Sequence, residues 1–280
     1  MKFVKPEGHS RKKVDWAGNV LINRTSSEED KNKAIEILDN WRASHRYPMH
    51  ILKKRLKNVS EEMDKDAFTV QRLKRLPSII NKLQRVYQGY KPTMKLSQMQ
   101  DIAGCRVIMP TIEQARELYE RYYLKGHIKH DKVNEKDYMM FPKADGYRSI
   151  HLIYKYNSDK EGKKDYKGLL VEIQIRSKLQ HLWATAIEIV DFFTKQAIKS
   201  NEGQEDWINF FRLVSSAFAM SEGTPPIRRT PKNKKELYKQ IKTQEKKLQV
   251  IQVMEGWTHA VRIFEEMVEK NKMFIFFFLN

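Results

Sequence analysis

The chain has 280 residues, 40% of them hydrophobic, and its 53 basic and 35 acidic side chains give a formal net charge of +18. The apolar content excludes global disorder, and the length suits one large domain, or one domain of about 200 residues with an appendage. The excess of positive charge favours polyanionic partners such as nucleotides, RNA, DNA or anionic lipid.

Cysteine content, apolar runs and short motifs exclude several classes of protein. The single cysteine, Cys105, excludes an internal disulfide, and the longest apolar run, residues 273–279, is too short to span a bilayer. The first six residues contain no apolar signal-peptide core, so we expect a cytoplasmic protein without a membrane partner. No Cys/His spacing resembles a zinc site, and no P-loop or GxGxxG motif is present.

Two helices are predicted near the N-terminus. Ser26, followed three residues later by Glu29, forms a capping-box pattern that predicts a helix running to about Ser44. Pro48 separates this helix from a second one predicted over residues 49–63.

Short strands alternate with helices in the middle of the chain. Residues 67–74 and 104–109 favour strands, Pro77 suits the first turn of a helix, and residues 112–123 predict another helix.

A hairpin and a helix follow this region. Residues 149–156 and 169–176 alternate as strands, and the polar residues between them predict a hairpin with a long loop. Residues 179–193 predict an amphipathic helix.

The C-terminal part combines loops with a charged helix. Residues 201–206 and 221–232 favour loops, and residues 234–271 predict a helix that Gly256 interrupts. Residues 273–279 predict a strand. Because an unpaired apolar strand invites aggregation, we expect it either to dock on the domain or to begin a further module.

The strand at residues 171–176 alternates apolar and polar side chains with period two, so its apolar residues are expected to face a core. The opposite face then carries a carboxylate, an amide and a guanidinium: Glu172, Gln174 and Arg176. This set suits a metal-bound phosphate, and the alternative is a half-buried strand with a solvated outer face.

Cations and a hydroxyl surround the start of the helix that contains Pro77. Arg72, Lys74, Ser78 and Lys82 follow the pattern R-x-K-x-x-x-S-x-x-x-K, which suits a triphosphate. The alternative is a solvated basic face.

Two further segments carry candidate residues. Asp101 begins a strand, a common position for a Mg²⁺ ligand, although a capping or surface role is the alternative. Tyr147 follows a Gly turn that can leave its ring open to a stacking base. A histidine such as His151, taken alone, is more often a partly buried residue whose hydrogen bonds are made within the protein.

Together these segments resemble the synthetase domain of the RelA/SpoT alarmone enzymes, in residues 72–82, 101–108, 146–151 and 171–176. The resemblance covers residues 66–193 and implies a nucleotidyltransferase-like α+β fold. Such a fold is a mixed β-sheet of about five strands flanked by helices, with helical N- and C-terminal extensions. No adjoining hydrolase domain is apparent, which implies a small, single-function synthetase.

Two features resemble the toxic branch of the small alarmone synthetases. Residues 10–18 and 41–45 are similar to the leader of that branch. Ile187 and Glu188 stand where housekeeping enzymes carry Glu and His. We expect a helical N-terminal segment at 1–65, a synthetase domain at 66–225, and a charged helical extension with a terminal strand at 226–280.

The resemblance implies an ATP-dependent pyrophosphokinase, in which a ribose hydroxyl attacks the β-phosphorus of ATP and AMP leaves. Asp101 and Glu172 would hold Mg²⁺, and Glu172 would also accept the proton of the hydroxyl. Arg72 would stack on adenine, and Tyr147 on the acceptor base within a site shaped by His151. The implied contacts with the ATP phosphates are Lys74, Ser78 and Lys82, with Arg106 as a secondary candidate. The implied secondary candidates for acceptor binding are Lys136, Lys143, Gln174 and Arg176.

The acceptor implied by the toxic branch is the 3′-terminal CCA end of tRNA, whose modification blocks translation. Arg11, Lys12 and Lys13 are candidates for tRNA contact, with a solvated basic tail as the alternative. The alternative activity is synthesis of (p)ppGpp or ppApp from GDP, GTP or AMP. A third reading is a non-catalytic RNA-binding protein on the same fold.

The C-terminal stretch resembles the region that joins toxin to antitoxin in fused, phage-sensing relatives of the CapRel type. This resemblance implies an antitoxin protein or fused antitoxin module as a partner, and a phage protein as the trigger. An attached module after residue 280 would be auto-inhibitory.

Overall fold

The computed structural model describes residues 3–7, 10–85, 94–194 and 205–256, together with residues 259 and 262. The chain divides into two compact units. One contains Met1–Lys143 and Tyr147–Ala184, and the other contains Ala144–Gly146 and Thr185–Asn280. The three-segment division expected from the sequence stays a prediction.

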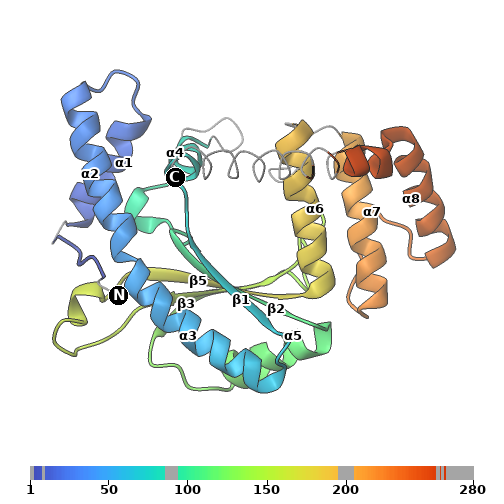
Figure 1. The fold of residues 1–280 in the computed structure, drawn as a ribbon, viewed down its shortest axis with the longest axis horizontal. Coiled ribbons are helices and arrows are strands. Elements are labelled where there is room, and N and C mark those ends of the chain that lie inside the picture. The colour runs from blue at the N-terminus through green and yellow to red at the C-terminus, as the bar shows by residue number, and fades with distance from the viewer. Residues whose placement is uncertain are drawn as a thin grey trace, which may run out of the picture. The chain divides into compact units, whose positions relative to one another are not determined.

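The first unit is built on a mixed sheet of five strands, in the order β1-β2-β5-β4-β3 (Figure 1). Only β2 and β5 run parallel, and the other neighbours pair antiparallel. The expected α+β fold is thereby confirmed. The strands are β1 (Phe68–Leu73), β2 (Ala103–Met109), β3 (Asp131–Asp137), β4 (Ile150–Lys155) and β5 (Leu170–Ser177).

One face of the sheet is apolar and covered. Val171, Ile173 and Ile175 of β5 are 0% exposed, which confirms the alternation expected for this strand. Figure 1 shows α3 (Arg46–Met63) and α5 (Ile112–Leu118) along this side, and their apolar residues join the same core cluster. The polar side chains of β5 therefore project from the opposite face.

The N-terminal helices form a second apolar cluster within the same unit. It joins α1 (Arg11–Ile22), α2 (Glu28–Ser44) and α4 (Leu76–Gln84) with the 3₁₀ turn Leu96–Gln98. Helix α1 was not expected from the sequence, because its basic first turn hides the apolar stripe that Val14 and Ala17 begin.

Two helix boundaries differ from the sequence expectation. The cap of α2 is Ser27, not Ser26, and its side chain accepts from the backbone N–H of Asp30. Helix α3 begins at Arg46, so Pro48 lies inside its first turn, where its missing N–H breaks no intrahelical hydrogen bond.

The centre of the first unit contains a strand that the sequence did not reveal. Strand β3 is polar throughout most of its length, because it lies at the sheet edge and pairs with β4 alone. Helix α5 is shorter than expected and continues as a π-helical turn, Tyr119–Leu124. Strands β4 and β5 form the expected hairpin, whose loop includes the 3₁₀ turn Lys164–Tyr166.

Helix α6 (Lys178–Thr194) follows β5, and the second unit adds α7 (Glu205–Ser221) and α8 (Lys234–Leu248). Gln249 has a left-handed backbone (φ 50°) that ends α8 before residues 250–256 become helical again. The strand expected at 273–279 lies outside the described residues. Within the described part of the chain, no helix is both long and apolar enough to cross a bilayer.

His45 lies at the junction of α2 and α3 and is only 1% exposed. Its Nδ1 lies 2.6 Å from the carbonyl oxygen of Trp41. Burial lowers the pKa of His45 to about 4, although the hydrogen bond to Trp41 opposes this shift. The folded protein therefore holds this imidazole neutral in mildly acidic solution.

The lowered pKa of His45 predicts a loss of stability on acidification. Between its unfolded pKa, about 6.5, and its folded pKa, only the unfolded chain binds the proton, so stability is complete above pH 6.5 and falls below it. We expect this residue to contribute about 2 kcal/mol of the stability lost between pH 7 and pH 5. Urea unfolding of wild type and His45→Asn at both pH values measures the contribution. Equal losses in the two proteins would contradict it.

Candidate functional site

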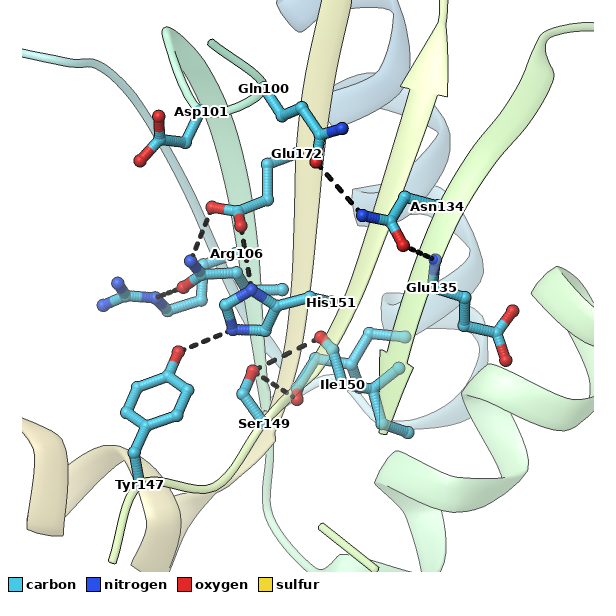
Figure 2. A network of polar contacts seen from close by, with 12 residues as sticks. Gln100, Asp101, Arg106, Asn134, Glu135, Tyr147, Ser149, Ile150, His151 and Glu172 are labelled. Carbon is cyan, nitrogen blue, oxygen red and sulfur yellow. Dashed lines mark hydrogen bonds and ion pairs between the residues drawn. The ribbon is translucent and has the colours of Figure 1, made fainter. Parts of the chain in front are cut away.

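The parallel pairing of β2 and β5 brings the candidate residues of distant segments onto one face of the sheet. Gly104 lies opposite Glu172, and Arg106 lies opposite Gln174. Asp101 precedes β2 by two residues, so it stands at the end of the sheet next to Glu172. Figure 2 shows the Asp101 and Glu172 side chains at the same end of the network.

Asp101 is held by two lysines. Its Oδ2 lies 3.0 Å from Lys74 Nζ, and its Oδ1 lies 2.8 Å from Lys82 Nζ. Burial alone raises the pKa of Asp101, but the ammonium groups of Lys82 and Lys74 together outweigh it and lower the pKa. The three residues form a compact charged cluster with a net charge of one positive unit.

The position of Lys74 depends on its backbone. Its N–H donates to the carbonyl oxygen of Ile102 at 2.8 Å, which extends the contact of β1 with β2. Its carbonyl oxygen accepts from Arg42 Nε of α2 at 2.7 Å. Arg42, from the N-terminal helices, therefore helps to fix the end of β1, where Lys74 lies.

Glu172 is a nearly buried carboxylate whose two oxygens both have partners. Oε1 lies 2.8 Å from His151 Nδ1, and Oε2 accepts from Gln174 Nε2 at 2.7 Å. Burial raises the pKa of Glu172, and the nearby Asp101 adds to that effect. The hydrogen bond and charge of His151, with a smaller contribution from Gln174, prevail and lower the pKa.

The partners of Glu172 are themselves oriented. Gln174 Oε1 accepts from Arg106 Nε at 3.0 Å, so the Gln174 amide nitrogen must face Glu172. The Tyr147 hydroxyl lies 2.7 Å from His151 Nε2 (Figure 2) and accepts from Arg176 Nη2 at 2.6 Å. Because guanidinium can only donate, the Tyr147 hydroxyl oxygen is the acceptor in its contact with Arg176. Tyr147 and Glu172 contact the two ring nitrogens of His151.

The Tyr147 ring is flanked by cations. Arg176 Cζ lies 5.0 Å from the ring centre, and the exposed Lys143 Nζ also lies 5.0 Å from it. The same ammonium lies 4.9 Å from the centre of the Tyr138 ring. Arg176 is 3% exposed, and its Nε and Nη1 have no hydrogen-bond partner among the described residues. We call Tyr138, Lys143, Tyr147 and His151 the tyrosine side of the site.

The structure brings together most of the residues expected from the sequence. The network joins Lys74, Lys82, Asp101, Arg106, Lys143, Tyr147, His151, Glu172, Gln174 and Arg176.

The remaining candidates lie outside the network. Arg72 pairs with Gly104 across β1 and β2 and is exposed, as is Ser78 on α4. Lys136 is exposed on β3, opposite His151. The basic cluster at residues 11–13 is exposed on the first turn of α1.

Two residues of the site were not identified as candidates from the sequence. Arg42 reaches Lys74 through the packing of separate segments, which periodicity does not reveal. Tyr138 follows an edge strand that itself escaped prediction, and its ring lies 5.9 Å from that of Tyr147.

The two carboxylates at this end of the sheet fit a magnesium ion. Asp101 and Glu172 offer hard oxygen ligands and are close enough for Asp101 to raise the pKa of Glu172. No group of three or more metal-ligating side chains occurs among the described residues. Mg²⁺ prefers one or two carboxylates completed by other oxygen ligands, so the pair suits such an ion.

Residues 71–191 match the family described as "Region found in RelA / SpoT proteins". The chain is 36% identical over 119 residues to GTP pyrophosphokinase YwaC of Bacillus subtilis (strain 168), covering 42% of this chain and 54% of the relative. It is 32% identical over 118 residues to GTP pyrophosphokinase YjbM of the same organism, and the match covers 42% of this chain and 53% of the relative. The chain spans about half the length of these curated relatives.

Solved structures share the fold. Small alarmone synthetase 1 from Bacillus subtilis, bound to its product pppGpp, superposes with a TM-score of 0.52 at 27% identity, covering 64% of this chain and 89% of that one. Small alarmone synthetase 2 from the same organism gives a TM-score of 0.53 at 24% identity, and the match covers 66% of this chain and 94% of that one.

The hydroxyl of Tyr147 is expected to stabilise the site. Tyr147→Phe keeps the ring but leaves the buried Arg176 and His151 without this partner, so we expect a loss of about 1–3 kcal/mol in unfolding free energy. Tyr138→Phe is the matched control, because the Tyr138 hydroxyl makes no hydrogen bond to any described residue, and it should change stability by less than about 0.5 kcal/mol. Urea unfolding measures both, and equal effects would contradict the prediction.

Proposed function

Because residues 71–191 form a RelA/SpoT-type synthetase domain, we propose that the protein is a small alarmone synthetase-like pyrophosphokinase. It transfers the terminal pyrophosphoryl group of ATP to a ribose 3′-hydroxyl. The observation that carries the proposal is a nearly buried, ionised Glu172 set in a row with Tyr147 and His151, next to the Asp101–lysine cluster.

ATP binds on the side of Asp101. Lys74 and Lys82 already stand beside a carboxylate, and a triphosphate offers them more negative charge than Asp101 does. Ser78, on the same helix as Lys82, adds a hydroxyl contact, and the exposed Arg72 stacks on adenine. Mg²⁺ held by Asp101 and Glu172 neutralises phosphate charge when it is bound.

The acceptor binds at Tyr147, and its 3′-hydroxyl meets Glu172. The hydroxyl proton passes to the Glu172 carboxylate as the ribose oxygen forms a bond to the β-phosphorus. The bond from that phosphorus to the α,β-bridging oxygen breaks, and AMP leaves with the electron pair. Because this step needs positioning and charge neutralisation above all, the fixed orientation of Glu172 by His151 and Gln174 is the main contribution of the protein.

For the acceptor we propose the 3′-terminal CCA end of tRNA, so that transfer inhibits translation. The net charge of +18 favours a polyanion larger than a mononucleotide, and the exposed residues 11–13 add local positive charge. The second candidate is synthesis of (p)ppGpp or ppApp from GDP, GTP or AMP. The relatives named GTP pyrophosphokinases favour it.

A transfer assay distinguishes the two acceptors. Purified protein is incubated with ATP labelled in its γ-phosphate and with tRNA, GDP, GTP or AMP in separate reactions. We expect label on tRNA and little on the mononucleotides. Label on a mononucleotide but not on tRNA would reject the tRNA acceptor and leave the pyrophosphokinase activity standing, whereas no transfer to any acceptor would reject both.

We further propose that the protein acts as a toxin under an antitoxin protein or module, with a phage protein as a trigger and a role in phage defence. A basic enzyme that inactivates tRNA must be restrained in its own cell. Expression should therefore arrest growth even in cells that degrade alarmones. Arrest that disappears in such cells would favour (p)ppGpp synthesis instead.

Glu172→Gln separates catalysis from binding. Loss of the general base should lower transfer by about 10²–10⁴-fold while ATP and RNA binding are retained, because the amide keeps the size of the side chain. Glu113→Gln, at an exposed position on α5, is the matched control and should keep full activity. If Glu172→Gln still arrests growth fully, the third candidate, a non-catalytic RNA-binding protein, gains support.

A further inference from the structure

The turn that follows β3 displays an aromatic ring to solvent. Phe141 is 79% exposed, the largest exposed fraction among the large apolar side chains of the described residues. Single exposed apolar side chains are common on proteins, so exposure alone assigns no role. The surroundings of this ring are what set it apart.

The backbone that carries Phe141 is held firmly. The carbonyl oxygen of Asp137 accepts from the N–H of Phe141 at 3.0 Å, and Asp137 Oδ1 accepts from the N–H of Met139, also at 3.0 Å. Asp137 is ion-paired with Arg116. Met139 is fully buried, and its carbonyl oxygen accepts from Arg148 Nη1 at 3.0 Å. The ring is therefore displayed by an ordered turn with little conformational freedom to lose on binding.

Phe141 also adjoins the tyrosine side of the site. It lies two residues before Lys143, whose N–H donates to the carbonyl oxygen of Tyr147 at 3.2 Å. Two peptide units separate their Cα atoms by at most about 7 Å. The Lys143 ammonium lies over both the Tyr138 and Tyr147 rings. Three aromatic rings and an exposed cation thus follow one another along a single short segment.

We propose that Phe141 is a second stacking platform, which binds the nucleotide preceding the reacting one at the 3′ end of a single-stranded RNA acceptor. This inference rests on the proposed function. A mononucleotide uses one ring, Tyr147, and leaves Phe141 idle. A strand presents successive bases joined by phosphates, and proteins bind such strands with aromatic platforms and interleaved cations. Lys143 lies between Phe141 and Tyr147 along the chain, and its exposed side chain, whose ammonium lies over the Tyr147 ring, offers a positive charge to the linking phosphate.

The test compares a long and a short acceptor. The probes are the trinucleotide CpCpA, with a free 3′-hydroxyl, and AMP, and the measured quantity is the ratio of their kcat/KM values. Phe141→Ala should lower this ratio about tenfold, mainly through a higher KM for the trinucleotide, since stacking of one base is lost. Phe141→Trp should restore it. Phe68→Ala, at a 60% exposed phenylalanine on β1, is the matched control and should leave the ratio unchanged.

A binding measurement separates this inference from the proposed function. Fluorescence anisotropy of 5′-fluorescein-labelled CpCpA gives a dissociation constant that needs no transfer, and Phe141→Ala should raise it about tenfold. If wild type transfers to no acceptor but Phe141→Ala weakens binding, the proposed function fails and the platform stands. If transfer occurs but Phe141→Ala changes neither the kcat/KM ratio nor the dissociation constant, the stacking platform is refuted. It is also refuted if the wild-type protein does not bind the trinucleotide.

Discussion

The site depends on keeping a carboxylate ionised inside the protein. Moving a charged carboxylate out of water is unfavourable by several kcal/mol unless hydrogen bonds and charges replace the lost hydration. Glu172 receives that replacement from His151 on one oxygen and from Gln174 on the other. The result is a lowered pKa despite burial, so the carboxylate is ionised at neutral pH.

The hydrogen bonds to Glu172 require that the Gln174 amide and the His151 ring keep one orientation. A glutamine presents either its amide nitrogen or its oxygen, and Arg106 removes that choice by donating to the oxygen. The His151 ring is likewise held at both nitrogens, because Nδ1 lies 2.8 Å from Glu172 Oε1 and Nε2 lies 2.7 Å from the Tyr147 hydroxyl. Burial raises the pKa of Tyr147, which keeps its hydroxyl protonated. The electrostatics of the site therefore originate in residues that need not touch a substrate.

Sequence reasoning succeeded where one strand contained the whole signal. The period-two pattern of β5 placed Glu172, Gln174 and Arg176 on one face, and the structure confirms the alternation through the buried residues between them. It did not anticipate that Asp101 would bind Lys74 and Lys82, because that contact depends on how α4 meets the segment before β2. It also missed β3, since an edge strand with solvent on its outer side needs no apolar pattern.

The N-terminal helices contribute directly to the structure of the site. Arg42 of α2 donates to the carbonyl oxygen of Lys74, and the other side of that peptide is bonded to Ile102 at the entrance of β2. The main chain of Lys74 is thus fixed from two directions, while its ammonium contacts Asp101. Under the proposed function, exchange of Asp101 for a phosphate would replace one ion pair by another within a rigid frame, so little reorganisation would oppose nucleotide binding. The same reasoning explains why helices without a catalytic side chain join the compact unit that contains the sheet.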